Sequence, residues 1–203
     1  MKCYLASGAD SAPGIRRFGI GAGSTVLFVT TASEAEGPGP FAWLDRDRAG
    51  LQSTGATTRD FSFTGRSEVE IDEALAAVDA VWCAGGNTYY LLDQINRSGA
   101  RSAIERFVAG GGVYAGSSAG AIIATPDIEP VAEADQRDAA PGLVSTAGLG
   151  FFDRFIAPHA DCEELAAWHE QIRATTAADD VVFLRDDQAL VIDGTACAIV
   201  TEV

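Results

Sequence analysis

The sequence has few cysteines, few basic residues and no long apolar run. Its four cysteines, at positions 3, 83, 162 and 197, lie far apart and lack the paired spacing of a zinc site or the density of a disulfide scaffold. We therefore expect reduced thiols and a cytoplasmic protein. No stretch approaches the roughly 18 unbroken apolar residues of a membrane helix. No basic and apolar leader follows Met1, so we expect neither export nor a membrane partner.

The charge balance is strongly acidic, because 14 Lys and Arg stand against 29 Asp and Glu, for a formal charge of -15. Such a surface repels phosphate backbones and anionic lipids, so we expect no nucleic-acid partner. Acidity does not identify a substrate, since a local basic pocket can still hold an anionic ligand. The 203 residues, 47% of them hydrophobic, fit one domain over 1–203 that is large enough to bury a core.

Alternating strands and helices predict an α/β fold. Apolar runs rich in β-branched or aromatic residues predict buried strands, and apolar residues three and four apart predict helices between them. The predicted strands are 3–5, 25–30, 80–83, 113–115, 151–157, 181–184, 189–192 and 196–201, and the predicted helices are 69–78, 88–95, 102–109 and 163–173. This order predicts a doubly wound, mostly parallel sheet with a C-terminal hairpin at Asp193-Gly194. Residues 127–148, rich in Pro, Ala, Asp and Glu, predict a surface excursion around the site.

A glycine-flanked serine is the strongest functional signal. Gly116-Ser-Ser-Ala-Gly120 follows a predicted strand and precedes a helix-compatible run, the context in which Gly-x-Ser-x-Gly forms a nucleophile elbow. In such a turn the central residue, Ser118, is strained and its hydroxyl faces the pocket, while the N–H of Ala119 can bind an oxyanion. Ser117 lies off the centre and is interpreted as a structural or pocket hydroxyl. The alternative is a glycine-rich turn of a ligand-binding domain.

A second glycine-rich turn, Ala84-Gly-Gly-Asn-Thr88, also follows a predicted strand. Because the carboxyl ends of parallel strands share one edge of a sheet, this turn is expected near Ser118, where it can supply a second oxyanion donor. Asn87 is a candidate oxyanion or substrate-binding residue. Asn87 or Thr88 is also a plausible N-cap for the helix that follows, a role compatible with the first.

A serine nucleophile needs a base, and the sequence contains two histidines. His159 directly follows a predicted strand, whereas His169 lies among charged neighbours in a predicted helix and is expected to be exposed to solvent. His159 is therefore the candidate base. Asp161, Asp186 and Asp187 all follow strand-like runs and are candidates for orienting its imidazole, and their spacing does not choose among them.

In their order, these motifs resemble the peptidase E family of serine dipeptidases, which includes cyanophycinase-like exopeptidases and shares the architecture of class I glutamine amidotransferases. The resemblance rests on four segments, 84–88, 116–121, 158–159 and 186–190. It implies a three-layer sandwich around a mostly parallel sheet, with no metal or organic cofactor. The site residues it implies are Ser118 as nucleophile, His159 as base, Asp186 as orienting acid, and Gly86 and Ala119 as oxyanion donors.

The sequence departs from the family at two places. Asp186 stands where the family usually carries a glutamate, so either the backbone moves closer, or Asp187 or Asp161 orients the histidine, or the site works nearly as a dyad. Gln171 stands where the family offers an arginine for an N-terminal aspartate, with Arg173 close by. The sequence therefore does not predict specificity for an N-terminal aspartate.

The resemblance predicts a serine exopeptidase that hydrolyses short peptides through an acyl-enzyme. One alternative is a cyanophycinase-like peptidase acting on β-linked aspartyl peptides, and another is a non-catalytic ligand-binding domain of the same fold. A glutamine amidotransferase is disfavoured, because the centre of the elbow is serine and neither Cys83 nor Cys162 is placed to act as a thiol nucleophile. The expected partner is a short peptide, and a second copy of the chain, forming a homodimer, is a further candidate.

Overall fold

The computed structural model of the protein describes residues 1–202, whose backbone is built around a seven-stranded sheet. Five strands are parallel, and two antiparallel strands extend the sheet beyond β1. In spatial order the strands are β3 (Thr57–Phe61), β2 (Thr25–Val29), β4 (Ala80–Cys83), β5 (Val113–Ser117), β1 (Lys2–Ala6), β8 (Gln188–Asp193) and β9 (Ala196–Thr201). The predicted mostly parallel sheet and the C-terminal hairpin, β8 and β9, are thus confirmed.

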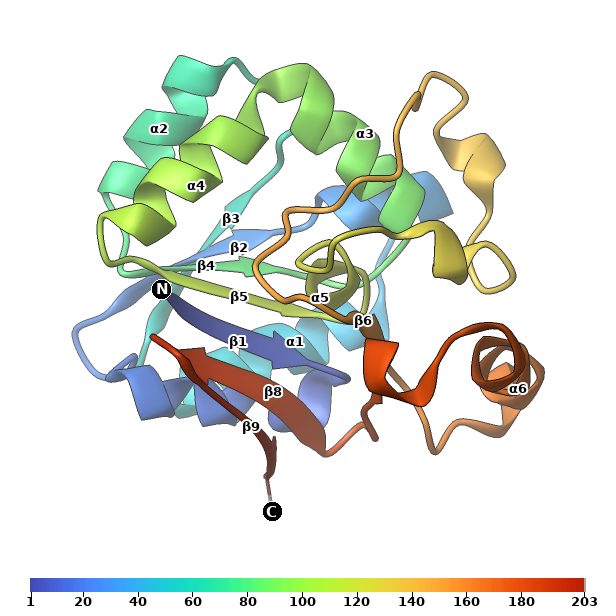
Figure 1. The fold of residues 1–203 in the computed structure, drawn as a ribbon. Coiled ribbons are helices and arrows are strands. Elements are labelled where there is room, and N and C mark those ends of the chain that lie inside the picture. The colour runs from blue at the N-terminus through green and yellow to red at the C-terminus, as the bar shows by residue number, and fades with distance from the viewer. Residues whose placement is uncertain (203) are drawn as a thin grey trace.

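Helices cover both faces of this sheet, which gives the predicted three layers (Figure 1). One face carries α2 (Glu68–Ala76), α3 (Thr88–Ser98) and α4 (Ala100–Ala109), and the short α5 (Ala119–Ile122) follows β5. The other face carries α1 (Ala42–Ser53) and the 3-10 segment η1 (Ala9–Phe18), which pack on each other. The remaining 3-10 segments are η2 (Thr31–Glu36), η3 (Glu129–Val131), η4 (Arg137–Ala139), η5 (Glu163–Leu165) and η6 (Ala178–Asp180).

The sheet separates two apolar cores because successive side chains of a strand point to opposite faces. In β1, Cys3 and Leu5 join the core under α2, α3 and α4, while Tyr4 and Ala6 join the core under α1 and η1. All four are fully buried. This two-sided burial explains why the central strands read as continuous apolar runs in the sequence. None of the helices in residues 1–202 has the length and apolar character needed to cross a bilayer.

A second, two-stranded sheet brings two distant loops together. β6 (Phe155–Ala157) and β7 (Val181–Phe183) are parallel, with Ala157 opposite Phe183, and α6 (Ala166–Thr175) lies in the connection between them. The carboxyl ends of parallel strands lie at the same edge. The residues after β6 and those after β7 therefore meet, next to the end of β5.

Three regions differ from the sequence-based expectation. The strand expected over 151–157 is confined to 155–157, because the preceding loop bonds to the chain after α5, with the N–H of Leu149 donating to Ile123 O and that of Phe152 to Ala124 O. Strand β3 and helix α1 were not predicted. In α1 only Asp47 and Leu51 are buried, so the helix carries no apolar stripe to reveal it.

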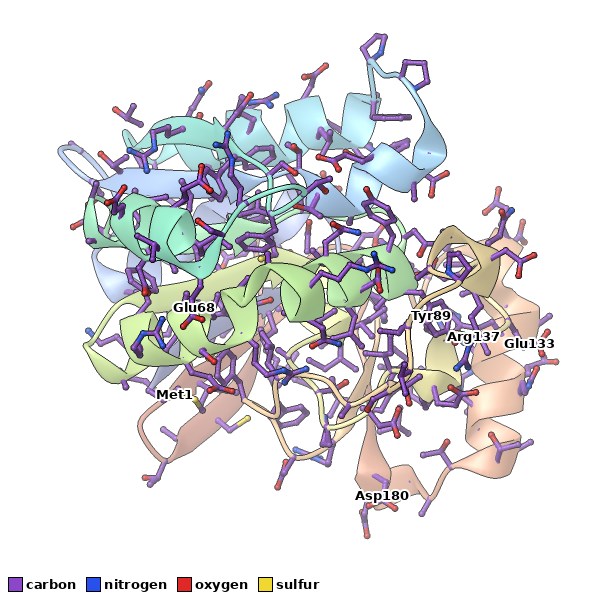
Figure 2. The ribbon with its side chains drawn as sticks, turned by 90° about the horizontal axis from the view of Figure 1, so that it is seen from above. Met1, Glu68, Tyr89, Glu133, Arg137 and Asp180 are labelled. Carbon is purple, nitrogen blue, oxygen red and sulfur yellow. The ribbon has the colours of Figure 1, made fainter. Side chains whose placement is uncertain are left out.

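The excursion predicted over 127–148 is confirmed and lies against the N-terminal end of α3. Asn87 donates from Nδ2 to Gln136 O at 2.9 Å, and the guanidinium of Arg137 lies over the Tyr89 ring, 5.5 Å from its centroid. Figure 2 shows Tyr89, Arg137 and Glu133 together on this side of the molecule. The excursion therefore forms one wall beside the carboxyl edge of the sheet.

Candidate active site

Ser118 occupies a sharp turn between β5 and α5. Its backbone has φ 50° and ψ -112°, a conformation that non-glycine residues rarely adopt and that is concentrated at functional sites. Its N–H donates to Ala6 O and Ser7 O, both at 3.1 Å, which ties the turn to the end of β1. Gly120 permits the turn, because a Cβ there would collide with the Cys83 carbonyl group on β4. The predicted elbow is thus present in the backbone.

His159 lies directly after β6, and its side chain reaches Ser118. Its Nε2 is 3.0 Å from Ser118 Oγ, and its Nδ1 is 2.5 Å from Asp186 Oδ1. The backbone of His159 is also in the left-handed region, with φ 59°. The hydroxyl of Ser7 holds it there by accepting from the His159 N–H at 2.7 Å and donating to Leu184 O at 3.0 Å. The structure therefore places Ser118, His159 and Asp186 in one hydrogen-bonded chain.

Of the three candidate acids, Asp186 is the one in contact with His159. The hydrogen bond with His159 lowers the pKa of Asp186, with burial opposing it. Asp161 supports the loop instead, because its Oδ1 accepts from the Asp186 N–H at 3.1 Å. Asp187 pairs with Arg185 at 3.1 Å. The parallel pairing of β6 and β7 thus allows an aspartate to reach the histidine.

Among the backbone N–H groups beside Ser118, those of Gly86 and Ala119 donate to no carbonyl oxygen within residues 1–202. Gly86 has φ 135°, and a Cβ there would lie 2.5 Å from the Ala32 carbonyl carbon, so this close approach requires glycine. The side chain of Asn87 caps α3 by accepting from the Tyr90 N–H at 2.9 Å. The capping role expected for Asn87 is confirmed, and a role in binding substrate stays a prediction.

A buried carboxylate that the sequence did not reveal lies behind the elbow. Asp47, on α1, is 2% exposed and accepts from Ser117 Oγ at 2.5 Å and from Trp82 Nε1 at 3.1 Å. Burial raises the pKa of Asp47 to about 6, with both hydrogen bonds opposing the rise. Ser117 is thus a buried hydroxyl bound to Asp47, in agreement with its interpretation as a structural or pocket residue.

Two cavities meet at Ser118 and His159. Cavity A, about 270 Å³, lies between η1, α1 and the elbow and includes Ser7, Arg46, Asp47 and Gly86 in its wall. Cavity B, about 190 Å³, lies under the excursion and α6 and includes Thr88, Val131, Asp135, Leu165 and Trp168. Within residues 1–202 no three His, Cys, Asp or Glu side chains are grouped to hold a metal ion. A small molecule placed against Ser118 can therefore extend into a cavity on either side.

The expectation for His169 was wrong. This residue is 1% exposed, and its Nε2 lies 2.8 Å from Pro158 O, next to the loop that carries His159. Its ring packs against the neighbouring rings of Trp168 and Phe183, and burial lowers its pKa. The charged neighbours in the sequence lie on the outer face of α6. His169 therefore supports the site from within the core.

The residues considered for binding an N-terminal aspartate lie elsewhere. The guanidinium of Arg173 lies over the Phe183 ring, 4.3 Å from its centroid, and is not part of either cavity wall. Gln171 is exposed on α6.

Cys83 lies buried behind the elbow, where burial raises the pKa of its thiol to about 12. That thiol is therefore protonated near neutral pH.

Comparison with known proteins agrees with this geometry. Residues 7–200 match the model of peptidase family S51. The chain is 32% identical over 135 residues to an uncharacterized peptidase of Pasteurella multocida (strain Pm70), covering 66% of this chain and 64% of that protein. It is 32% identical over 162 residues to peptidase E of Streptomyces coelicolor, covering 77% of this chain and 58% of that protein. The matched part is thus less than two thirds of either relative.

A solved structure extends the likeness to the whole fold. A crystal structure named for peptidase E, from Listeria monocytogenes EGD-e, superimposes with a TM-score of 0.91 at 26% identity and covers 100% of this chain and 98% of that one. The family model spans nearly the full sequence and includes all four motifs described above. The chain belongs to peptidase family S51.

Proposed function

We propose that the protein is a serine exopeptidase that hydrolyses short peptides. The observation that carries this proposal is the hydrogen-bonded chain from Ser118 Oγ through His159 to Asp186, at the meeting point of two small cavities. Membership of peptidase family S51 and the likeness to peptidase E support the same activity.

The residues divide the reaction between them. His159 Nε2 takes the proton of Ser118 Oγ as the oxygen attacks the peptide carbonyl carbon. The N–H groups of Gly86 and Ala119 stabilise the oxyanion, and such donors are commonly worth about 10²- to 10³-fold in rate each. His159 then gives the proton to the leaving amine as the C–N bond breaks. Water, activated by His159, hydrolyses the resulting ester, and Asp186 stabilises the charged imidazole throughout.

Short peptides are favoured because the space around Ser118 is divided into two compact compartments of about 270 and 190 Å³. A long polypeptide needs an open cleft that continues on both sides of the scissile bond. A dipeptide or tripeptide needs room for about one residue on each side. The compartments therefore support an exopeptidase acting on small substrates.

The test is hydrolysis of a panel of dipeptides and tripeptides by the wild type and by Ser118→Ala. We expect cleavage by the wild type and a loss of at least about 10⁴-fold in the variant. Ser145→Ala, an exposed serine of the excursion, is the matched control and should keep full activity. A fluorophosphonate should label the wild type and the control but not Ser118→Ala.

The outcomes separate the competing functions. Cleavage confined to β-linked aspartyl peptides would favour a cyanophycinase-like enzyme. Absence of both cleavage and labelling in a folded wild type would favour a non-catalytic binding domain. Equal cleavage by the wild type and Ser118→Ala would refute the assignment of the nucleophile.

A further inference from the structure

Cavity B combines an apolar wall with a single carboxylate and a few uncharged polar groups. Its wall includes Val131, Leu165 and Trp168, and its single ionisable side chain besides His159 is Asp135. No Lys or Arg within residues 1–202 lines it. A ligand group that enters cavity B therefore meets an apolar surface and one negative charge.

The polar groups of cavity B have unused hydrogen-bonding capacity. Asp135 Oδ2 accepts from the Thr88 N–H at 2.7 Å, while no residue in 1–202 donates to Oδ1. Thr88 is fully buried and lines the cavity, and its Oγ1 lacks a hydrogen-bond partner of good geometry within the described chain. Burial raises the pKa of Asp135, and the Thr88 hydroxyl lies close enough to that carboxyl to oppose the rise. Buried polar atoms are nearly always paired, so an orphaned hydroxyl beside a half-free carboxylate indicates a ligand with donors. A primary ammonium group, with three donors, has this character.

Cavity A, unlike cavity B, contains a cationic side chain. Arg46 lines it and forms no ion pair within residues 1–202. Of the three carboxylates in this wall, Asp47 is bound to Ser117 and Trp82, and Asp186 is bound to His159. The third, Asp10, is exposed to solvent and forms no ion pair with Arg46. Arg46 can therefore bind a carboxylate of the ligand, for which a guanidinium is well suited.

These charges match the two ends of a dipeptide. We propose that the N-terminal residue of the substrate occupies cavity B, with its ammonium group bound by Asp135 and Thr88 Oγ1 and an apolar side chain against Leu165 and Trp168. The C-terminal carboxylate then faces Arg46 in cavity A, and the scissile carbonyl lies at Ser118 between them. This inference rests on the proposed function and adds the orientation of the substrate and the class of its N-terminal residue.

The size and charge of cavity B determine which N-terminal residue fits. Its volume of about 190 Å³ equals that of about six waters in the liquid, which suits a side chain such as leucine or methionine. An N-terminal aspartate would place a second carboxylate beside Asp135 with no cation to pair it. Burying an unpaired charge is strongly unfavourable, so aspartyl dipeptides should be poor substrates.

The test compares Leu-Gly, Asp-Gly and N-acetyl-Leu-Gly. In hydrolysis by the wild type, kcat/KM for Leu-Gly should exceed that for each of the other two by at least about 100-fold. Asp135→Asn, which keeps an acceptor for the Thr88 N–H, should raise the KM for Leu-Gly by about 10- to 100-fold and change kcat by less than about threefold. Asp138→Asn, at an exposed position of the excursion, is the matched control and should leave both constants unchanged.

Binding to Ser118→Ala, measured by titration calorimetry, tests the inference without catalysis. Leu-Gly should bind at least about tenfold more tightly than Asp-Gly or the acetylated peptide. The inference is overturned if Asp-Gly is bound or cleaved as well as Leu-Gly, if acetylation has no effect, or if Ser118→Ala binds none of the three. Cleavage of Asp-Gly by the wild type but not by Ser118→Ala would leave the proposed function standing while refuting the inference.

Discussion

Replacing Asp47 by asparagine tests how the buried carboxylate behind the elbow affects stability. Asparagine has nearly the same shape, and its carbonyl oxygen can accept from Ser117 and Trp82 as the carboxylate does. It carries no charge at any pH, so it imitates the protonated aspartate. The difference in unfolding free energy between Asp47→Asn and the wild type therefore isolates the cost of ionising Asp47 in the folded protein.

The sign of the effect follows from the direction of the pKa change. The pKa of Asp47 is about 6 in the folded protein against 3.8 as the reference value, so between these values the folded state binds more protons than the unfolded state. The wild type is then destabilised as the pH rises through this window. Full ionisation of Asp47 costs the folded wild type about 3 kcal/mol. The unfolding free energy of Asp47→Asn, relative to that of the wild type, should therefore rise by about 2 kcal/mol between pH 4 and pH 8.

Urea unfolding followed by circular dichroism at pH 4, 5, 6, 7 and 8 measures this difference, with equal m-values as the check on two-state behaviour. A constant offset between the two proteins reflects altered hydrogen bonds and carries no information on ionisation. Asp193→Asn, at an exposed position of the C-terminal hairpin, controls for the loss of one surface charge. A difference for Asp47→Asn that stays flat within about 0.5 kcal/mol would show that burial does not disfavour this carboxylate.

Three further substitutions probe the site. Asp186→Asn should lower kcat by about 10²- to 10⁴-fold with little change in the melting temperature, because the imidazole loses its orienting charge; unchanged kcat would mean that a dyad suffices. Gly86→Ala should cost at least about 1–3 kcal/mol in urea unfolding, since its Cβ meets the Ala32 carbonyl group and its φ is 135°; wild-type stability would refute the close approach. Ser7→Ala should cost about 1–3 kcal/mol by leaving the His159 N–H unpaired, and an unaltered unfolding midpoint would contradict that.

Most of the correct predictions came from patterns in contiguous stretches of the sequence. The elbow was predicted because glycines flank Ser118 immediately after an apolar strand, and both features are contiguous in the chain. The spacing of the strands did not choose between Asp186 and Asp161, and only the resemblance to the peptidase E family pointed to Asp186. The two aspartates bond to each other through the Asp186 N–H, and only the packing of β6 on β7 decides which carboxylate reaches His159.

Helix α1 shows where pattern-based prediction fails. A helix is recognised by an apolar stripe, and in α1 the buried face consists of Asp47 and Leu51. The helix was therefore missed, together with Arg46 and the carboxylate that binds Ser117. The prediction that His169 is exposed failed for a related reason. A hydrogen bond with Pro158 O compensates for burying the imidazole, and no local sequence pattern reveals that partner.

The Ser7 hydroxyl has a consequence for how the protein must fold. It joins the N–H of His159, 152 residues away, to the carbonyl of Leu184, 177 residues away. Contacts between such distant segments form late, since the entropy of closing the intervening chain opposes them until other packing has reduced it. During refolding, helices can form while Ser118 still lacks its histidine. The return of Ser118 reactivity during refolding therefore reports that the long-range contacts of Ser7 with His159 and Leu184 have formed.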